Sequence, residues 1–223
     1  MATHSEQREY GLLVAQLRAL DSDIEAARAI APRATHGLGL DFHARHEIPH
    51  AVYGERVRLP DGAEIVIRPI EPGDVDQLRV GFEHLSAVSR FRRFRGRVDR
   101  LTSHQLAEMT NVDHESHEAM VAFAAANGEG IGIARYMRAD DDPLQAEFTC
   151  TVADLWQSRG VGTALVERLA ARARAVGIER FTTVILAGYQ PARRLLAHVA
   201  DEISEHGEGG TVEIIARGRD AAS

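Results

Sequence analysis

The sequence contains no lysine, so all 26 basic residues of the 223-residue chain are arginine. A protein without lysine cannot be regulated by acetylation of its own lysine side chains. The single cysteine, Cys150, excludes an intrachain disulfide and a cysteine-rich zinc site. No apolar run approaches the roughly 20 residues that a membrane-spanning helix needs. The first residues show no secretory signal, so we expect a cytoplasmic protein that does not engage a membrane.

Composition otherwise predicts a globular protein with a buried core. Hydrophobic residues make up 44% of the chain and charged residues 26%. The formal net charge of −7 argues against nucleic acid as a partner. Six arginines between Ser89 and Arg100 interleave with Phe91 and Phe94, a pattern that can also bind single-stranded nucleic acid. We favour a helix that buries the phenylalanines and leaves the arginines outside.

The first 60 residues divide into a predicted helix and a connector. Residues 6–31 carry apolar side chains at steps of three and four, which predicts an amphipathic helix. Docking on its own domain is favoured, and self-association into a homodimer is the alternative. Residues 32–60 lack periodicity and are interpreted as a connector. We interpret its histidines as solvated and expect no bound metal; they are His36, His43, His46 and His50.

After residue 60, strand and helix patterns follow one another. In chain order they are strand 63–68, helices 72–85, 88–94 and 103–109, strands 119–125, 131–137 and 147–152, helix 160–176, strand 181–186, helix 191–199 and strand 211–216. The acidic, glycine-rich residues 198–210 are assigned to no strand. This order predicts a mixed α/β (α+β) domain over residues 56–218, preceded by the helix and connector of residues 1–55.

The residues between the strand 147–152 and the next helix are rich in glycine. Free N–H groups and a partial positive charge mark the first turn of a helix. Gly160 and Gly162 let an anion approach that backbone closely, which predicts a cradle for a phosphate or pyrophosphate. Arg159 would add a fixed cation, and Ser158 and Thr163 would add hydroxyls. Glycines used only for close packing are the alternative.

This segment resembles a known family. Gln157–Gly162 matches the Gln/Arg-X-X-Gly-X-Gly/Ala signature of the GNAT superfamily of N-acetyltransferases. Further likeness lies in Ile67–Asp74, Leu85–Phe94, Ala134–Tyr136 and Ala146–Phe148, the second of which is similar to bacterial protein-lysine acetyltransferases. The resemblance covers roughly residues 56–200. It implies a GNAT-like mixed, mostly antiparallel sheet with splayed middle strands between helices, and acetyl-CoA as co-substrate.

The same resemblance implies where acetyl-CoA binds. The strand 147–152 would pair with the pantetheine, the Val152 N–H would polarise the thioester carbonyl, and the pyrophosphate would lie on residues 157–163. The implied cofactor-binding residues are Cys150, Thr151, Val152, Gln157, Ser158, Arg159, Gly160, Val161, Gly162 and Thr163. Many members protonate the departing thiolate with a tyrosine at the position of Leu196, and Tyr189 is the candidate for that role here.

Transfer to an amine requires an uncharged nitrogen and therefore benefits from a base. Glu147 is the candidate, because the lysine acetyltransferases carry a glutamate base at the start of this strand. Partial burial beside Phe148 would raise its pKa. Glu118 and His114 are alternative bases, and Cys150 as an acyl-carrying nucleophile is disfavoured because no activating histidine is evident.

The resulting prediction is an N-acyltransferase that moves an acetyl group from acetyl-CoA to a primary amine. The amine would belong to a protein lysine or to a small molecule. The alternative is a noncatalytic acyl-CoA-binding regulatory domain, which the departures from the family pattern around Tyr189 favour.

Overall fold

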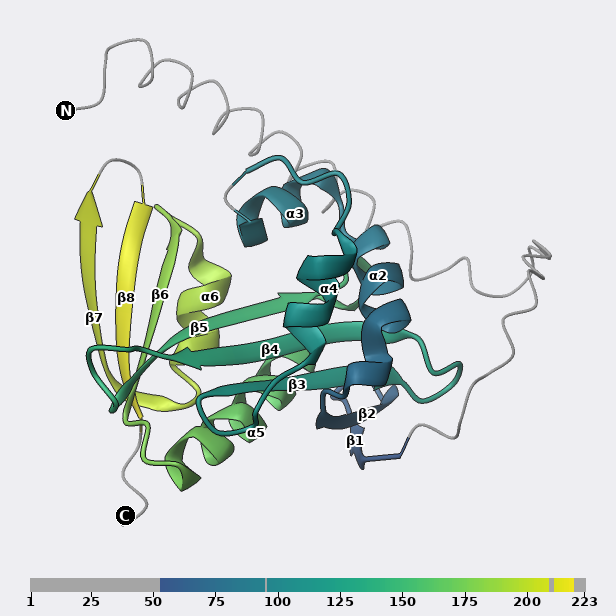
Figure 1. Ribbon diagram of the computed structural model, residues 1–223, viewed down its shortest axis with the longest axis horizontal. Helices are drawn as coiled ribbons and strands as arrows, with labels where there is room; N and C mark the ends of the chain where they lie inside the picture. The colour runs from purple at the N-terminus through teal and green to yellow at the C-terminus, as the bar shows by residue number, and fades with distance from the viewer. Residues whose placement is uncertain (1–52, 95, 209–210, 219–223) are drawn as a thin grey trace, which may run out of the picture. The chain divides into compact units, whose positions relative to one another are not determined.

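The computed structural model describes residues 53–94, 96–208 and 211–218 (Figure 1). The predicted helix 6–31, the four connector histidines and most of the connector lie outside these residues. Within the described ranges, no helix combines the length and apolar character that crossing a membrane requires.

An eight-stranded sheet forms the centre of the described domain, in the spatial order β1-β2-β3-β4-β5-β6-β8-β7. The strands are β1 (Glu55–Arg58), β2 (Glu64–Pro69), β3 (His117–Ala124), β4 (Gly130–Arg138), β5 (Gln145–Val152), β6 (Arg180–Leu186), β7 (Ala200–Glu208) and β8 (Thr211–Gly218). Every neighbouring pair is antiparallel except β5 and β6, which are parallel. The predicted mixed, mostly antiparallel sheet is therefore confirmed.

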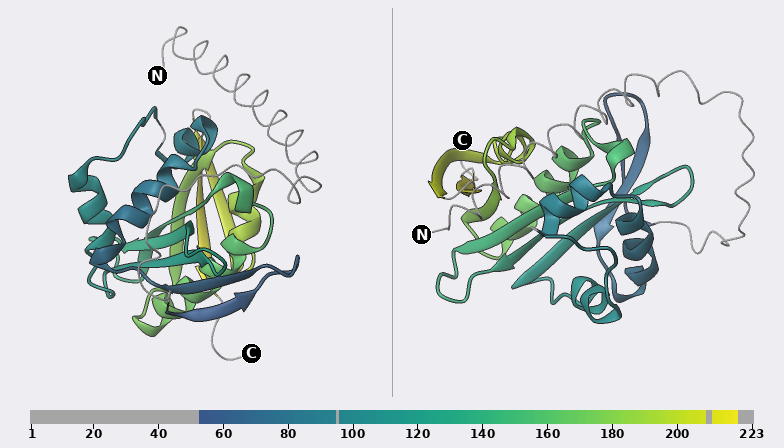
Figure 2. Two further views of the ribbon diagram at one scale, coloured as in Figure 1. Left: turned by 90° about the vertical axis from the view of Figure 1, so that its right-hand side faces the viewer. Right: turned by 90° about the horizontal axis from the view of Figure 1, so that it is seen from above.

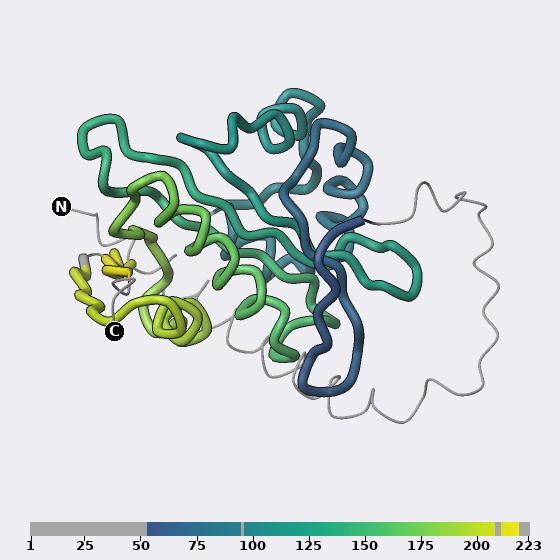
Figure 3. The backbone as a smooth tube through the Cα atoms, turned by 90° about the horizontal axis from the view of Figure 1, so that it is seen from below, coloured from purple at the N-terminus to yellow at the C-terminus, as the bar shows by residue number. Residues whose placement is uncertain are grey.

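Helices cover both faces of this sheet. They are α2 (Val75–Glu83), α3 (Ala87–Phe94), α4 (Ser103–Thr110), α5 (Val161–Ala175) and α6 (Gln190–Leu196). Helices α2 and α4 pack on one face, and α5 lies across β3 and β4 on the other, as the view from below shows (Figures 1 and 3). Successive side chains of β3 point to opposite faces of the sheet. Met120 and Ala122 belong to the core under α5, and Val121 and Phe123 belong to the cluster near α2.

Local signals account for the ends of the helices. Thr102 caps α4, because its hydroxyl accepts a hydrogen bond from the Gln105 N–H at 3.2 Å. After the last turn of α5, Gly177 adopts a φ of +82°, a left-handed conformation that glycine adopts without strain. Along α5, Leu165 and Leu169 are fully buried, so the stripe predicted for this helix is its core-facing side.

The structure contains two strands that the sequence does not predict. Strand β1 lies in the predicted connector, and β7 lies in the acidic stretch that was assigned to no strand. Both are edge strands, which pair on one side only and are largely exposed. Their polar residues therefore fall on both faces and produce no alternating pattern. The predicted helix 191–199 also ends earlier, at Leu196.

The two middle strands separate along their length. Strand β5 pairs with β4 from Ala146 to Val152, but with β6 only from Gln145 to Glu147. Beyond Glu147, β6 and its partners β8 and β7 diverge from β3–β5, which Figures 1 and 2 show from three directions. This opening is the splay that the family resemblance implies.

Candidate active site

The free edge of β5 borders the opening between the middle strands. The Ala153 N–H donates to the Ile131 carbonyl of β4 at 2.9 Å. Because successive amides of a strand point to opposite sides, the Val152 N–H and C=O point away from β4. The Val152 carbonyl accepts a hydrogen bond from Gln157 Nε2 at 3.0 Å. The Val152 N–H thus faces the opening, where its predicted role requires it.

Helix α5 begins at this same end of β5. Its N-cap, Gly160, has φ 98° and ψ −5° and provides no side-chain cap to the first turn. A Cβ atom at Gly162 would lie 3.4 Å from Leu195 Cδ1 and 3.8 Å from Val152 Cγ2. Val161 is fully buried, so only its backbone faces the turn. The first-turn N–H groups of α5 are therefore without a side-chain cap and lie against the wall of the opening, at the place where the sequence predicts an anion cradle.

Arg159, beside this turn, is held by a residue that is distant in sequence. Its Nε donates to Asp61 Oδ2 at 2.6 Å, and its guanidinium lies 4.1 Å from the centre of the Trp156 ring. Ser158 is exposed and has a φ of 59°, so its backbone turns just before Gly160. Asp61 is 98 residues from Arg159 in sequence, and no local pattern predicts their contact.

Asp154 connects the loop to the start of α3. Its carboxylate accepts hydrogen bonds from the Ser86 N–H at 2.7 Å, the Ser86 hydroxyl at 3.1 Å and the Ser89 hydroxyl at 2.8 Å. Gln157 Nε2 lies 3.3 Å from the same Ser89 hydroxyl. The side chain of Gln157, predicted to bind acetyl-CoA, thus forms hydrogen bonds within the protein, and sequence reasoning did not identify Asp154 as its neighbour.

A groove of about 710 Å³ lies on the sheet face beneath α4 and contains Glu147. Glu147 is opposite Met137 on β4, and Met137 is opposite His117 on β3, so the three occupy one row across the sheet. Thr149 lies on the same face of β5. Glu147 is exposed, so the partial burial anticipated for it is not present.

The alternative bases lie elsewhere. Glu118 is fully buried on the opposite face of β3, next to Tyr136 in the register. Its carboxylate accepts a hydrogen bond from Arg172 of α5 and lies 2.7 Å from His114 Nδ1. The strand period of two separates Glu118 from its neighbour His117, which faces the groove. Glu118 and His114 are therefore not brought together with Glu147.

Two groups at the floor of the groove have shifted pKa values. Burial, with a smaller contribution from Arg135, lowers the pKa of His117 to about 4, so His117 is neutral near pH 7. Burial, followed by the nearby Arg93, lowers the pKa of Arg135 to about 10, which leaves its charge intact. Arg135 Nη2 contacts His117 Nε2, and the neutral ring nitrogen can accept this hydrogen bond.

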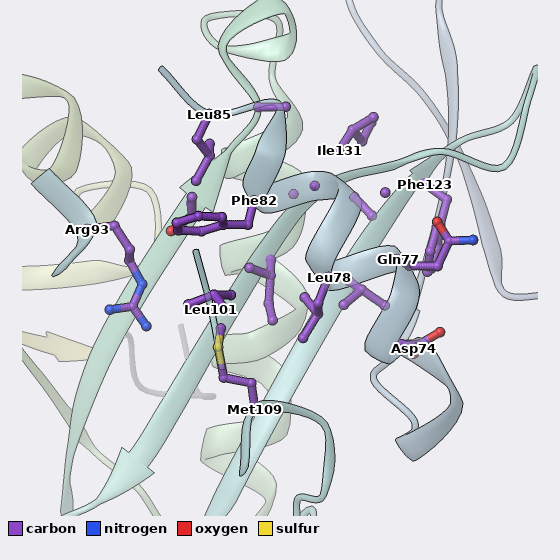
Figure 4. A pocket seen from close by; sticks show the side chains of 18 of the residues that line it. Asp74, Gln77, Leu78, Phe82, Leu85, Arg93, Leu101, Met109, Phe123 and Ile131 are labelled. Atoms are coloured by element: carbon purple, nitrogen blue, oxygen red, sulfur yellow. The ribbon is translucent and has the colours of Figure 1, made fainter. Parts of the chain in front are cut away.

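Cys150 and Thr151 face opposite sides of β5. Cys150 packs against the core under α5, and burial raises the pKa of its thiol to about 12. Thr151 lines a smaller apolar cavity of about 60 Å³ beside Leu78 and Phe82 (Figure 4). The Thr151 hydroxyl oxygen is buried there without a hydrogen-bond partner in the described part of the chain. The raised pKa of the Cys150 thiol further disfavours this cysteine as a nucleophile.

Tyr189 lies on the wall opposite β5. It follows the end of β6, where its N–H donates to the Leu186 carbonyl at 3.0 Å, and it is the N-cap residue of α6. The Arg92 guanidinium of α3 lies 4.8 Å from the centre of the Tyr189 ring. Helix α3 therefore spans the mouth of the opening, from the loop at Asp154 to the start of α6.

Comparisons with known proteins agree on one family. Residues 84–200 match the acetyltransferase (GNAT) family. Over 140 residues, 63% of this chain, the sequence is 31% identical to acetyltransferase Pat of Mycolicibacterium smegmatis. That alignment covers 42% of Pat, so the chain spans less than half the length of this relative. Over 139 residues, 61% of this chain and 74% of the relative, it is 30% identical to acetyltransferase PA5475 of Pseudomonas aeruginosa.

The structure is similar to the crystal structure of the GNAT domain of S. lividans PAT. The two share a TM-score of 0.66 and 28% sequence identity, over 73% of this chain and 96% of that domain.

Proposed function

The chain belongs to the GNAT family of acetyltransferases, and on this premise we propose that it transfers an acetyl group from acetyl-CoA to a primary amine, with Glu147 as the general base. One observation carries the proposal. Glu147 is the last residue of β5 that pairs with β6, so it lies in the groove at the point where the opening begins. Val152, at the other end of that edge, adjoins the uncapped turn of α5.

The residues around the opening fit acetyl-CoA. The backbone N–H groups at the start of α5 would hold the pyrophosphate, with Arg159 as a nearby cation. The edge of β5 from Phe148 to Val152, unpaired with β6, would hydrogen-bond the pantetheine. The Val152 N–H would then donate to the thioester carbonyl oxygen, where negative charge develops during attack.

The chemistry follows from these positions. The amine nitrogen attacks the thioester carbon, a C–N bond forms, and the proton that the nitrogen loses passes to the Glu147 carboxylate directly or through a water. The C–S bond breaks as the amide forms. The leaving thiol resembles cysteine, with a pKa of about 8.5, and departs as a thiolate. Tyr189, on the opposite wall, is the proposed source of the proton that the thiolate takes up.

The groove beneath α4 supplies the route for the amine. Its volume of about 710 Å³ lies within the range of small-ligand pockets, about 300–1,000 Å³. It can take a lysine side chain or a small amine. Exposure of Glu147 supports its role, since a base that receives a proton from an incoming amine must be reachable.

The test is acetyl transfer from acetyl-CoA to an amine panel by wild type and Glu147→Gln. Loss of the base should lower kcat/KM by about 10²–10⁴-fold, while the Kd for CoA measured by calorimetry stays unchanged. Glu167→Gln, at an exposed position of α5, is the matched control and should retain the wild-type rate. An unaltered rate in Glu147→Gln would remove Glu147 from this role. Tight CoA binding by wild type without transfer to any amine would favour a noncatalytic acyl-CoA-binding domain.

The Tyr189→Phe variant tests the acid separately. It keeps the aromatic ring under Arg92 and removes only the hydroxyl. We expect a lower kcat with unchanged CoA affinity. A variant with the full wild-type kcat would show that Tyr189 serves only in packing.

A further inference from the structure

Two arginine side chains converge in the groove next to Glu147. Arg135 is opposite Thr149 in the register of β4 and β5, and Glu147 is two residues from Thr149 on the same face. Such diagonal neighbours lie about 7–8 Å apart. Arg93 reaches the groove from α3, and Figure 4 shows its guanidinium directed toward Leu101, which lines both cavities.

Arg135 has no acidic partner in the described part of the chain. Its contact there is with the neutral ring of His117, and no carboxylate oxygen among the described residues lies within ion-pair distance of its guanidinium. Arginine in a partly buried position is ordinarily paired with an acid. The remaining donors of Arg135 therefore offer an anion a partly desolvated binding position.

The closeness of Arg93 strengthens this attraction. Arg93 is near enough to lower the pKa of Arg135, and its guanidinium lies 5.0 Å from the centre of the Phe94 ring. Two like charges in one concave site repel each other, and a bound anion relieves that repulsion. A guanidinium also binds a carboxylate through two parallel hydrogen bonds.

The two acidic groups of the groove, Glu108 and Glu147, form no ion pair with Arg135. Glu108 of α4 lies 3.3 Å from His104 of the same helix, and both side chains are largely exposed. Glu147 acts on Arg135 only at longer range, through a Coulombic attraction smaller than that of Glu108. Among the described residues, Arg135 thus keeps its positive charge without an ion pair, and the acid diagonal to it in the register is the proposed base.

We propose that Arg135, assisted by Arg93, binds a carboxylate group of the amine acceptor and thereby places its amine at Glu147. The acceptor class is a primary amine that bears a carboxylate within the same molecule or the same short peptide. The inference rests on the proposed function. CoA is not the source of the anion, because Thr149, opposite Arg135, is three residues from Val152, about 10 Å farther from the α5 turn.

The first experiment compares matched acceptors with acetyl-CoA as donor. Unbranched ω-amino acids of three to six carbons are paired with alkylamines of the same chain length. The best amino acid should show a kcat/KM at least about tenfold above its alkylamine. A second pair consists of lysine peptides with either a glutamate or a glutamine next to the lysine. This pair tests whether the carboxylate belongs to a peptide, whereas the first pair tests whether it belongs to a small amino acid. Preference in either pair supports the inference.

Substitution of Arg135 tests whether this residue causes the preference for carboxylate-bearing acceptors. Arg135→Met should abolish most of the difference by raising KM for the carboxylate-bearing acceptor, and should leave kcat/KM for the alkylamine and the Kd for CoA unchanged. Arg135→Lys should keep part of the preference. Arg56→Met, on the exposed edge strand β1, removes an arginine far from the groove and should match wild type.

Three outcomes would overturn the inference. Equal kcat/KM for both members of every pair would exclude a carboxylate site and leave the proposed function intact. An equal loss in Arg135→Met for both members, or a weakened Kd for CoA, would show a structural or CoA-binding role instead. Absence of transfer to any amine by wild type would overturn the proposed function and this inference with it.

Discussion

The carboxylate of Asp154 accepts a hydrogen bond from the backbone N–H of Ser86 at 2.7 Å, although 68 residues separate the two in the chain. The contact joins the end of β5 to the start of α3. Helix α3 in turn carries Arg92 over Tyr189 and Arg93 into the groove. One carboxylate therefore links the loop between β5 and α5 to α3, the helix that spans the opening.

Asp154→Asn should lower both stability and activity. The amide keeps the shape but replaces a charged acceptor of three hydrogen bonds, and hydrogen bonds to charged groups contribute about 1.5–3 kcal/mol each. We expect the free energy of unfolding in urea to fall by about 1–3 kcal/mol and the Kd for CoA to rise. Asp76→Asn, at a side chain that is 83% exposed, is the control. Equal stability of both variants would contradict this role of Asp154.

Three glycine substitutions separate backbone strain from crowding. Alanine at Gly160 would meet Pro60 Cδ at 3.2 Å and must adopt φ +98°, whereas Gly177 has φ +82° in open space and Gly73 has neither constraint. A left-handed alanine costs about 1–2 kcal/mol. Urea unfolding should therefore show the largest loss for Gly160→Ala, an intermediate loss for Gly177→Ala and almost none for Gly73→Ala.

Only the first of these glycines lies at the cradle. Gly160→Ala should also weaken CoA binding in calorimetry, while Gly177→Ala should not. A Gly160→Ala protein with wild-type affinity for CoA would show that the conformation of this turn is not required for binding.

The lowered pKa of His117 makes stability depend on pH. Its folded-state pKa is about 4 and its ordinary value is 6.5, so between these values the unfolded chain binds more protons. The stabilisation of the folded protein by neutral His117 is complete above pH 6.5 and is lost as the pH falls toward 4. Allowing for partial exposure, we expect unfolding free energy to fall by about 1–2 kcal/mol across this window.

Urea unfolding at several pH values measures that loss. His117→Gln should show a flatter dependence than wild type across this window, because its side chain does not titrate. His104→Gln, at a side chain that is 82% exposed, should keep the wild-type slope. If the stability of His117→Gln depended on pH as steeply as that of wild type, His117 would not be the source of the pH dependence.

Cys150 should behave as an unreactive thiol. Burial raises its pKa to about 12, which at pH 8 leaves on the order of a thousandfold less thiolate than a free cysteine with a pKa of about 8.5. Iodoacetamide should alkylate the native protein far more slowly than the urea-unfolded protein. Cys150→Ala should retain acetyl transfer, and a complete loss with intact CoA binding would revive an acyl-cysteine step.

The sequence alone predicts most elements of the fold and the cradle. The stripe of α5, the strands of the β3–β5 meander and the glycines at the start of α5 depend on spacings of a few residues, which one segment contains in full. The sequence does not predict the edge strands β1 and β7. Each pairs on one side only and is largely exposed, so its residues lack the alternation of polar and apolar side chains that indicates a strand.

The local order of residues in this chain was sufficient to predict a position where an anion and a thioester carrier would bind, and to predict most of the elements around it. Tertiary structure alone decided which side chains meet around the opening and the groove: Asp61 beside Arg159, Asp154 beside Ser86, and Arg135 diagonal to Glu147. The reason is that periodicity and capping act between near neighbours in sequence. These three contacts join residues 12, 68 and 98 positions apart through the strand order and register of the sheet, and no local spacing encodes them.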